Sequence, residues 1–235
     1  MVAIKELLKQ IFSQEVKLTE NQSVVSGQAM LNNQLIHILG VKESTFLGAE
    51  QALIMAQYVI DILERQSKEP VLLLVDVAGQ GLTMRDEWLG MQQYFGHLLE
   101  CLECLRLQGN ALISLVYNQA LGGAFIAYGL MADTILALPD AALAVMWLEG
   151  IAKVTKIELS TLQELSKTFP VFAPGVKNFY ELGGIHEIVS PSEIAEKIDW
   201  AIQKKSTQDD RALLGSKRGG RTLAYSIINK VANHL

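Results

Sequence analysis

Two adjacent glycines followed by an alanine, Gly122-Gly123-Ala124, lie where a continuous apolar run gives way to a predicted helix. Glycine has no Cβ, so the backbone of such a turn can approach a ligand closely and leaves its N–H groups unshielded. N–H groups at the start of a helix attract negative charge, because the peptide dipoles are aligned there. The turn therefore has the features of an oxyanion hole. The alternative interpretation is that the glycines only allow tight packing between strand and helix.

A second turn of this kind follows the preceding apolar run, where Asp76 is succeeded by Gly79, Gln80 and Gly81. The carboxyl ends of consecutive parallel strands usually lie side by side, so we expect the two glycine turns to meet at one crevice. Asp76, Gly79, Gln80 and Gly81 are therefore predicted to bind substrate. For Asp76 the alternative is a structural carboxylate that caps the loop.

Other residue types that carry chemistry do not form a recognisable site. Cys101 and Cys104 have the spacing of a metal or redox pair, but they lie within a predicted helix without a second pair, and we interpret them as two small buried side chains. The histidines are scattered, and His37 lies on the inward face of a predicted strand, which favours a core histidine. Glu149, the acidic residue near the glycine turns, is interpreted as structural. No metal site, nucleophile motif or nucleotide-binding motif is expected.

The composition constrains the class of protein that positions these residues. The chain has 235 residues, of which 50% are hydrophobic and 19% charged, so it can bury a large core and is expected to form one large domain. Its net charge of −5 argues against a nucleic-acid partner, because a phosphate backbone requires a basic surface. Two cysteines cannot build a disulfide framework, which favours a reducing compartment. Without a signal peptide or an apolar window of membrane-spanning length, we expect a cytoplasmic protein with no membrane partner.

The hydrophobic pattern predicts strands that alternate with helices, which is typical of an α/β protein. Two alternating runs around Asn32-Asn33-Gln34 predict a β-hairpin of Val24–Leu31 and Leu35–Val41. The continuous apolar runs Val71–Val75 and Ala111–Tyr117 predict strands that are covered on both faces. Further strands are predicted near Thr134–Leu138, Ala142–Met146 and Glu187–Val189.

Helices are predicted between these strands. One begins at an N-cap on Ser44 or Thr45 and ends near Gln66. Its predicted buried stripe consists of Phe46, Ala49, Leu53, Ala56, Ile60 and Leu63. A long helix is predicted from about Met84 to Leu107, with Gly109 as its stop signal. The apolar positions expected along it are Met84, Trp88, Met91, Phe95, Leu98, Leu102 and Leu105.

The C-terminal end is predicted to be organised separately. Lys204–Asp210 is the most polar segment of the chain, which is typical of a linker. We therefore expect residues 1–203 to form the main domain and residues 204–235 to form a linker and a C-terminal helical tail, packed on the domain or on a partner.

Taken together, these segments resemble a known family. Val75-Asp76-Val77-Ala78-Gly79 is similar to the Asp-x-Pro-Gly loop of acyl-CoA carboxyltransferase subunits, and Gly122-Gly123-Ala124-Phe125 is similar to their Gly-Gly-Ala-aromatic turn. The order and spacing of the motifs resemble most closely the gamma-subunit family of biotin-independent malonate decarboxylases, over about residues 20–235. The other segments that carry this resemblance are Ala132-Asp133, Ala137-Leu138-Pro139, Val145-Met146, Val154-Thr155-Lys156 and Arg218-Gly219-Gly220-Arg221.

The resemblance implies a crotonase-like (ClpP/crotonase) spiral of β-β-α units with a helical C-terminal part. It implies a decarboxylase subunit that pairs with a beta subunit of the same fold and converts a malonyl thioester on an acyl carrier protein into an acetyl thioester and CO2. It also implies that the acyl carrier protein bears a phosphoribosyl-dephospho-CoA prosthetic group, and that an acyl-carrier transferase subunit belongs to the complex. No cofactor is expected on this chain itself.

The chain departs from the biotin-dependent carboxyltransferases at Ala78 and Gln80, where those proteins usually carry proline and an aromatic residue around the glycine. No biotin is therefore expected. The alternatives are a subunit of a biotin-dependent carboxyltransferase, a hydratase or isomerase of the crotonase type, and a non-catalytic scaffold that shapes the site of its partner.

The implied reaction assigns a role to the glycine turn. Loss of CO2 from a malonyl thioester leaves an enolate, so the catalyst must stabilise an oxyanion and orient the carboxylate. We expect the N–H groups of Gly123 and Ala124, in the catalytic turn that begins at Gly122, to hold an oxygen of the departing carboxylate. The beta subunit is expected to supply the hole for the thioester oxygen.

The long predicted helix also indicates an assembly. Beyond its core stripe it carries Leu89, Tyr94, Leu99 and Cys101 on other faces, which is more apolar surface than one core contact requires. We therefore expect an obligate interface with the beta subunit that buries more than roughly 2,000 Å².

Overall fold

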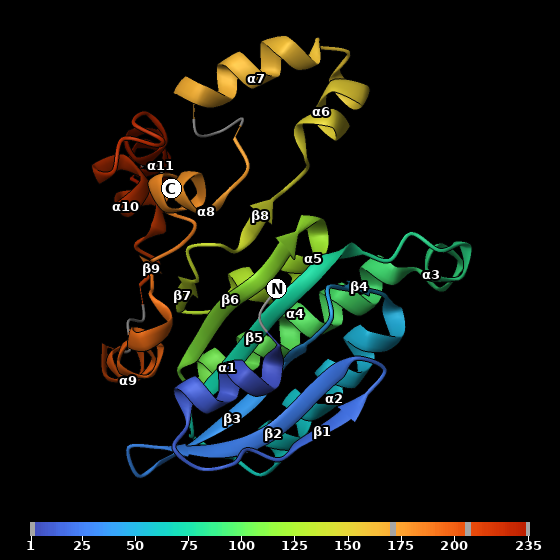
Figure 1. Cartoon of the computed structure of the whole chain (residues 1–235), viewed down its shortest axis with the longest axis vertical. Coiled ribbons are helices and arrows are strands. Elements are labelled where there is room, and N and C mark those ends of the chain that lie inside the picture. Colours follow the sequence, from blue (N-terminus) through green and yellow to red (C-terminus); the bar gives the residue numbers. More distant parts are fainter. Residues whose placement is uncertain (1–2, 170–172, 205–207, 234–235) are drawn as a thin grey trace.

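The chain folds as a central sheet with helices packed on both faces (Figure 1). The computed structural model describes residues 3–169, 173–204 and 208–233. Its strands are β1 Leu18–Asn21, β2 Val24–Leu31, β3 Gln34–Val41, β4 Thr45–Leu47, β5 Val71–Gln80, β6 Leu112–Leu121, β7 Thr134–Ala137, β8 Ala142–Ala144 and β9 Glu187–Ile188. Its α-helices are α1 Ile4–Ile11, α2 Ala49–Glu64, α3 Met84–Leu89, α4 Met91–Gln108, α5 Gly122–Ala127, α6 Leu148–Thr155, α7 Leu159–Thr168, α8 Val176–Glu181, α9 Ile194–Lys204, α10 Arg211–Lys217 and α11 Ala224–Ala232. The α/β class predicted from the sequence is confirmed, and none of these described helices is both long and apolar enough to cross a membrane.

The sheet is built around the two continuous apolar runs. The strands follow the order β1-β2-β3-β5-β6-β7-β9, antiparallel from β1 to β3 and parallel from β3 onward. Side chains alternate between the faces of a strand, so Leu72 and Leu74 of β5 pack in the cluster of α1 and α9, while Leu73 and Val75 pack in that of α2 and α4. Since both faces are covered, β5 has no polar alternation.

A seam crosses this sheet, because β5 and β6 each pair with two shorter strands in succession. β3 pairs with the first half of β5, up to Gly40 opposite Leu74, and β4 pairs with the second half, from Thr45 opposite Val77. In the same way β7 pairs with the first half of β6 and β8 with the second. We define the seam as the two breaks at residues 42–44 and 138–141.

The predicted hairpin is confirmed as β2 and β3, which are antiparallel with Leu31 opposite Gln34. Asn32 and Asn33 have φ values of 47° and 64°, the two positive values that a tight hairpin turn requires and that asparagine tolerates. The alternation expected in the second strand is wrong, because Ile36 and Ile38 are as buried as its other face. Helix α1 covers that second face, and its cluster includes both residues.

The predicted start of the first helix is wrong. The chain first forms the short strand β4, and α2 begins only at Ala49, after Gly48. Ser44 is not an N-cap, because its N–H and hydroxyl groups donate to the Asp76 carboxylate. The stripe is also rotated from the predicted one, and Phe46 and Leu53 are exposed. The buried residues of α2 are Ala49, Ala52, Met55, Ala56, Val59 and Ile62.

The predicted long helix is two helices. Gly90 has a φ of 71° and separates α3 from α4, and Gly109, with a φ of 100°, ends α4 as predicted. Met84 and Trp88, expected in the core stripe, are 66% and 82% exposed, because α3 leaves the body of the protein (Figure 1). Cys101 is buried, as expected of a small core side chain and contrary to its expected place on an outer face of the helix.

The tail after residue 204 forms two helices where one was expected, and residues 205–207 of the predicted linker lie outside the described residues. The first of these helices, α10, packs with the residues that follow it on the main body, whereas α11 has no buried residue. The guanidinium of Arg218 donates to the carbonyls of Tyr180, Ile185 and His186, and it lies 3.6 Å from the Tyr180 ring centre. A Cβ on Gly220 would lie 2.2 Å from the Glu181 carbonyl oxygen, so glycine is required for this contact.

Candidate active site

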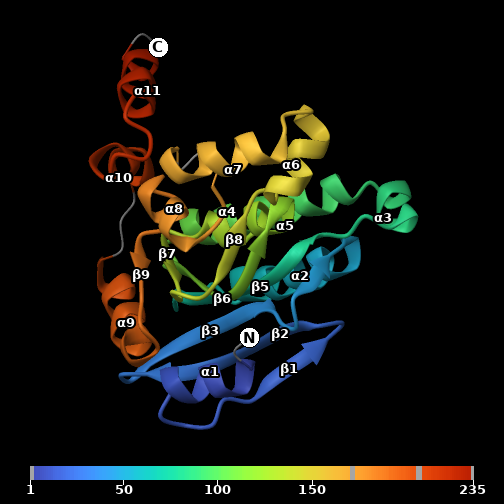
Figure 2. The same ribbon diagram turned by 45° about the horizontal axis from the view of Figure 1, so that its top comes forward.

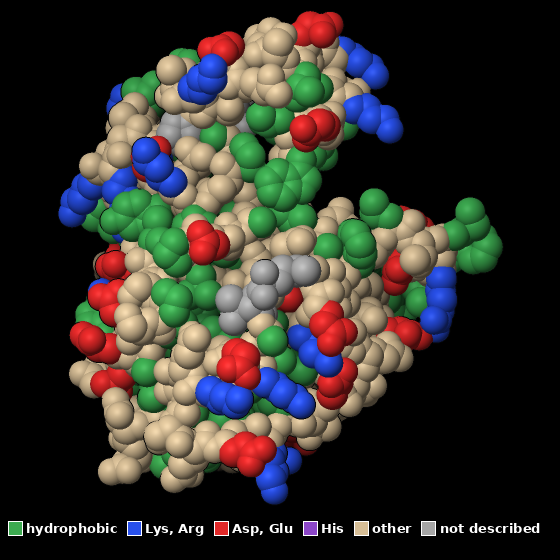
Figure 3. Space-filling view, in the orientation of Figure 1, with side chains coloured by type: hydrophobic (Ala, Val, Ile, Leu, Met, Phe, Trp, Pro, Cys, Tyr) green, Lys and Arg blue, Asp and Glu red, His purple; other side chains and the backbone are tan. Residues whose placement is uncertain are grey.

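A pocket of about 630 Å³ opens at the carboxyl ends of β5 and β6, as the two predicted glycine turns suggested. Both strands run further than expected, to Gln80 and Leu121, so these turns lie at or near the strand ends. The pocket is lined by Phe46, Ala78, Gly79, Gln80, Leu82, Gln119, Leu121, Gly122, Ala144, Val145, Met146, Trp147, Glu149 and Gly150. Figures 1 and 2 show α3 to one side of these strand ends and α6 above them, and Figure 3 shows a hollow with hydrophobic side chains between these arms.

One hydrogen bond joins the two turns. The backbone N–H of Gly123, at the start of α5, donates to Oε1 of Gln80 at 2.8 Å. A Cβ on Gly122 or Gly123 would lie 2.9 Å or 3.1 Å from this oxygen, so the glycine pair makes room for the Gln80 carboxamide. Gly122 also has a φ of 57°, which favours glycine. The N–H that the sequence indicated as an oxyanion donor therefore holds a side-chain oxygen of the same protein.

The predicted site residues do not all reach the pocket. Gly79, Gln80 and Gly122 line it, whereas Ala124 is fully buried in the core. Gly81 lies behind the wall, where its N–H donates to the Leu47 carbonyl oxygen at 2.6 Å and a Cβ would meet an Asp86 carboxylate oxygen at 2.8 Å. The structure thus brings the two turns together but leaves Gly123, Ala124 and Gly81 outside the pocket lining.

Asp76 bridges the seam instead of facing the pocket. Its side chain is 1% exposed and accepts hydrogen bonds from the Ser44 N–H and hydroxyl groups, each at 3.0 Å. It also accepts from the Asn118 carboxamide at 3.2 Å and from the Gln119 N–H at 3.3 Å. These bonds satisfy a carboxylate that would otherwise be costly to bury. The geometry therefore corresponds to the loop-capping alternative, and Asp76 has no contact with the pocket.

The electrostatics of the pocket are simple. Among the described residues that line it, Glu149 is the one ionisable side chain, and no lysine, arginine or histidine contributes. Beneath the strand ends, burial raises the pKa of Tyr117 and of Tyr128, and the nearby Asp76 carboxylate adds to this rise. Both phenols therefore stay neutral near pH 7 and do not act as bases. The pocket offers amide donors and an apolar wall.

The residues set aside in the sequence hold no alternative site. No cluster of three potential metal ligands occurs within the described ranges. Cys101 is buried but Cys104 is exposed, so the expectation that both thiols are buried is wrong for Cys104. His37 is 2% exposed and within hydrogen-bonding distance of the Gln28, Tyr58 and Ser67 side chains, which confirms a core histidine; burial lowers its pKa.

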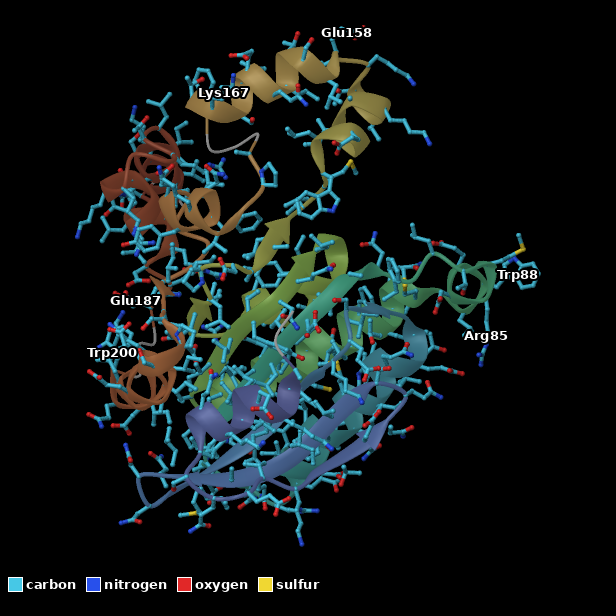
Figure 4. The ribbon with its side chains drawn as sticks, viewed as in Figure 1. Arg85, Trp88, Glu158, Lys167, Glu187 and Trp200 are labelled. Atoms are coloured by element: carbon cyan, nitrogen blue, oxygen red, sulfur yellow. The ribbon has the colours of Figure 1, made fainter. Side chains whose placement is uncertain are left out.

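Sequence reasoning missed the apolar rim of the pocket. We define this rim as the exposed pocket-lining residues Phe46, Leu82, Val145, Met146 and Trp147, together with the exposed Met84 and Trp88 of the neighbouring helix α3. Trp88 is labelled in Figure 4 at the tip of the α3 arm, where it points away from the body. The available signal was the cluster Val145-Met146-Trp147 at the end of a predicted strand, because three consecutive large apolar residues there are rarely left to solvent.

The family follows from comparison with known proteins. Residues 42–235 match the family model described as malonate decarboxylase gamma subunit. This chain belongs to that family. The resemblance read from the sequence motifs is thereby confirmed, together with the carboxyltransferase-like fold.

Individual relatives agree with this placement. A Malonomonas rubra protein described as malonyl-S-ACP:biotin-protein carboxyltransferase MADD is 31% identical over 227 residues, covering 88% of this chain and 77% of the relative. The acetyl-coenzyme A carboxylase carboxyl transferase subunit beta of Endomicrobium trichonymphae is 24% identical, and the match covers 67% of this chain but only 55% of that protein.

Solved structures share the fold over most of the gamma-subunit chain. A chain of a Pseudomonas malonate decarboxylase hetero-tetramer in complex with coenzyme A matches with a TM-score of 0.85 at 19% identity, covering 97% of each chain. A chain of the Pseudomonas malonate decarboxylase MdcD-MdcE hetero-dimer matches with a TM-score of 0.79 at 21% identity, covering 97% of this chain and 96% of that one. A transcarboxylase 12S chain gives 0.71 at 21% identity and covers 87% of this chain and 42% of the other.

Proposed function

We propose that this chain, assembled with a beta subunit of the same fold, decarboxylates a malonyl thioester to an acetyl thioester and CO2, as a carbon–carbon lyase. The observation that carries the proposal is the pocket at the ends of β5 and β6, which combines an apolar wall with amide donors and has no cationic side chain among its described lining residues. Membership of the malonate decarboxylase gamma-subunit family supplies the reaction class.

Charge development explains why such a pocket suits decarboxylation. The bond between the carboxylate carbon and the α-carbon breaks, its electron pair passes to the enolate, and the negative charge moves from the carboxylate to the thioester oxygen. Uptake of one proton at the α-carbon then gives the acetyl thioester. A cation fixed beside the carboxylate would stabilise the reactant more than the transition state and would slow the reaction. An apolar wall with neutral donors orients the carboxylate without this penalty.

We propose that the Gly122-Gly123-Ala124 turn forms the donor side of this site and that the beta subunit provides the donors for the thioester oxygen. Gly122 lines the pocket, the Gly123 N–H connects to it through the Gln80 carboxamide, and Ala124 is fully buried. Asp76 acts in this proposal as a positioning residue, because its carboxylate holds Ser44 on one side and Gln119 on the other. Gly79 belongs to the pocket wall, and Gly81 supports it from behind.

The beta subunit is proposed to cover the apolar rim. The rim is exposed in this chain and continuous with the pocket, so a partner seated on it would complete the wall and exclude water. The MdcD-MdcE hetero-dimer provides a precedent for such pairing in a protein of the same fold.

The substrate is proposed to arrive on an acyl carrier protein, in the cytoplasm, on a phosphoribosyl-dephospho-CoA arm that belongs to the carrier and is acylated by an acyl-carrier transferase subunit. The pocket is open on its rim side, so an acyl group carried by another protein can enter it. The thioester end supplies the electron sink for the reaction, and this chain binds and orients the carboxylate end.

Reconstitution tests this function. The beta subunit with and without this chain is given malonyl-loaded carrier, and CO2 release is measured. We expect release that depends on both subunits, and a Gly123→Pro variant, which removes the N–H, to lose on the order of 10²–10³ in turnover. Full activity of the beta subunit alone would mean that this chain is a non-catalytic scaffold. Near-normal turnover of an assembled Gly123→Pro complex would mean that the glycine turn has no role in the mechanism.

The second candidate is a biotin-dependent malonyl carboxyltransferase subunit, favoured by the 31% identity to the Malonomonas rubra protein. In that reaction the departing CO2 is transferred to biotin on a carrier protein. Addition of avidin to the native complex distinguishes the two: we expect unchanged CO2 release, whereas inhibition would favour the biotin-dependent function.

A further inference from the structure

We infer that Gln80 contacts the substrate directly and selects acyl groups that end in a carboxylate, with its Nε2 group as the donor. This inference rests on the proposed function, because it assigns the carboxylate end of the malonyl group to the pocket at the ends of β5 and β6. In this inference the Gly123 N–H acts on the substrate through the Gln80 carboxamide that it holds in place.

The orientation of the Gln80 carboxamide follows from its partner. The Gly123 N–H can only donate, so the atom that faces it at 2.8 Å must be the oxygen Oε1. The amide group is planar, and Nε2 with its two N–H groups is therefore directed away from Gly123. The hydrogen bond thus fixes which end of the carboxamide is presented to a ligand.

Nε2 has no protein acceptor among the described residues, although Oε1 has a well-formed donor. Gln80 is partly buried and belongs to the pocket wall, at the end of β5. Nε2 lies 3.8 Å from the position that a Cβ on Gly123 would take, further than Oε1 at 3.1 Å. Nε2 therefore lies at the wall of a mostly apolar pocket, and one of its N–H groups can donate to an oxygen of a bound carboxylate.

The chemistry of the reaction favours this neutral donor. The carboxylate loses its charge as CO2 departs, so a group that binds it weakly but directionally orients the reactant without holding it back. The Gly123 N–H, at the start of α5, polarises the carboxamide and makes Nε2 a stronger donor. An acetyl group has no carboxylate for Nε2, so the product is released while malonyl is retained.

The test uses the complex of this chain with its beta subunit and three variants. Gln80→Leu keeps the size of the side chain but has neither donor nor acceptor. Gln80→Glu keeps an acceptor for Gly123 and replaces the donors by a negative charge. Gln57→Leu is the matched control, because Gln57 is exposed on α2 and bonds to Asp61 on the same helix. Assembly of each variant is checked by light scattering.

We expect Gln80→Leu to raise the KM for the malonyl-loaded carrier about tenfold or more, with a smaller change in kcat, because the lost hydrogen bond acts on the bound reactant. The inhibition constant of the acetyl-loaded carrier is expected to stay within about twofold, since the product does not use Nε2. Gln80→Glu is expected to lose more than Gln80→Leu, and Gln57→Leu is expected to match the wild type.

Two outcomes overturn the inference. An unchanged or lower KM for malonyl in Gln80→Leu means that Oε1 merely fills the place of a substrate oxygen and is displaced on binding. Equal losses for malonyl and acetyl carriers mean that Gln80 only shapes the pocket. If the wild-type complex releases no CO2, the proposed function itself fails, whereas normal wild-type release with normal Gln80 variants refutes the inference alone.

Discussion

The seam and the rim of the pocket lie only a few residues apart along the chain but are built in opposite ways. At the seam, the Asp76 carboxylate is 1% exposed and accepts hydrogen bonds from Ser44, Asn118 and Gln119. At the rim, Trp88 is 82% exposed and Leu82 is 74% exposed. The seam is complete within one chain, whereas the rim is an exposed apolar surface of the kind that proteins cover with a partner. The contrast separates the part of the site that this chain builds alone from the part that it shares.

Replacement of Asp76 by alanine should have the largest effect on stability. The variant removes the buried acceptor that the part-buried Ser44 N–H and the Asn118 carboxamide share, so we expect a loss of about 3 kcal/mol or more in the free energy of unfolding, measured by urea titration. The control Asp140→Ala removes an exposed carboxylate and should change this value by less than about 0.5 kcal/mol. Equal values for the two variants would show that the seam does not depend on Asp76.

Replacement of Trp88 by alanine should weaken binding of the partner at the rim and leave the stability of the folded chain unchanged. Trp88 has little contact with its own chain, so the unfolding free energy should change by less than about 0.5 kcal/mol. Exposed tryptophans at interfaces commonly contribute about 2 kcal/mol, so affinity for the beta subunit should fall about 30-fold. Isothermal titration calorimetry measures this affinity, and an unchanged dissociation constant would place the partner elsewhere.

Acidification should lower the stability of the folded body of the protein more than it affects the apolar rim. Burial lowers the pKa of His37 and of His186 below the ordinary histidine value, although Glu69 and Asp210 oppose the shift. The unfolded chain therefore takes up protons first, so the stability that the neutral histidines provide is complete above about pH 6.5 and is lost as pH falls through their lower folded pKa values.

Thermal unfolding at pH 7.5, 6.5 and 5.5 checks this sign. We expect the melting temperature to fall with pH, and a His37→Gln variant to show a shallower fall than the wild type. The exposed His97 is the control, and His97→Gln should leave the slope unchanged. A melting temperature that rises on acidification would contradict the assignment.

The smallest effect should come from a cysteine on the outer side of α4. Cys101 is buried and Cys104 exposed, so Cys104→Ser should change the unfolding free energy by less than about 0.5 kcal/mol, and Cys101→Ser by more, because a hydroxyl replaces a thiol in the core. Urea titration of both variants provides the comparison, and equal effects would mean that the two sides of α4 are equally covered.

The strongest sequence signals predicted the fold, and contacts between distant residues determined the rest. Asn32-Asn33 marked the hairpin and Gly109 the end of α4, because each turn requires a backbone conformation that few residue types adopt. The break at Gly90 was missed, since a glycine inside a helical pattern is often tolerated. The three-residue strand β4 was missed as well, because it is too short to show a period.

For the site, the sequence predicted that two glycine turns would meet, but not how. The bond from Gly123 to Gln80 depends on a side-chain rotamer and on the register of β5 against β6, which no local pattern encodes. Ala124 was expected to face the ligand and is buried, because the first turn of α5 rotates it into the core. The residues near the glycines could thus be identified from the sequence. Which of them line the pocket wall and which are buried in the core could not.

The seam has a consequence for local opening of the sheet. Strands β4 and β8 are short, and each meets the sheet through β5 or β6 beyond the break, so they form a small cooperative unit separate from the unit of β3 and β7. Their amide hydrogens should exchange with solvent sooner than those of the longer-paired strands, and hydrogen–deuterium exchange would resolve the two groups. The wall of the pocket can therefore reshape around an arriving acyl group while the buried sheet beneath it keeps its pairing.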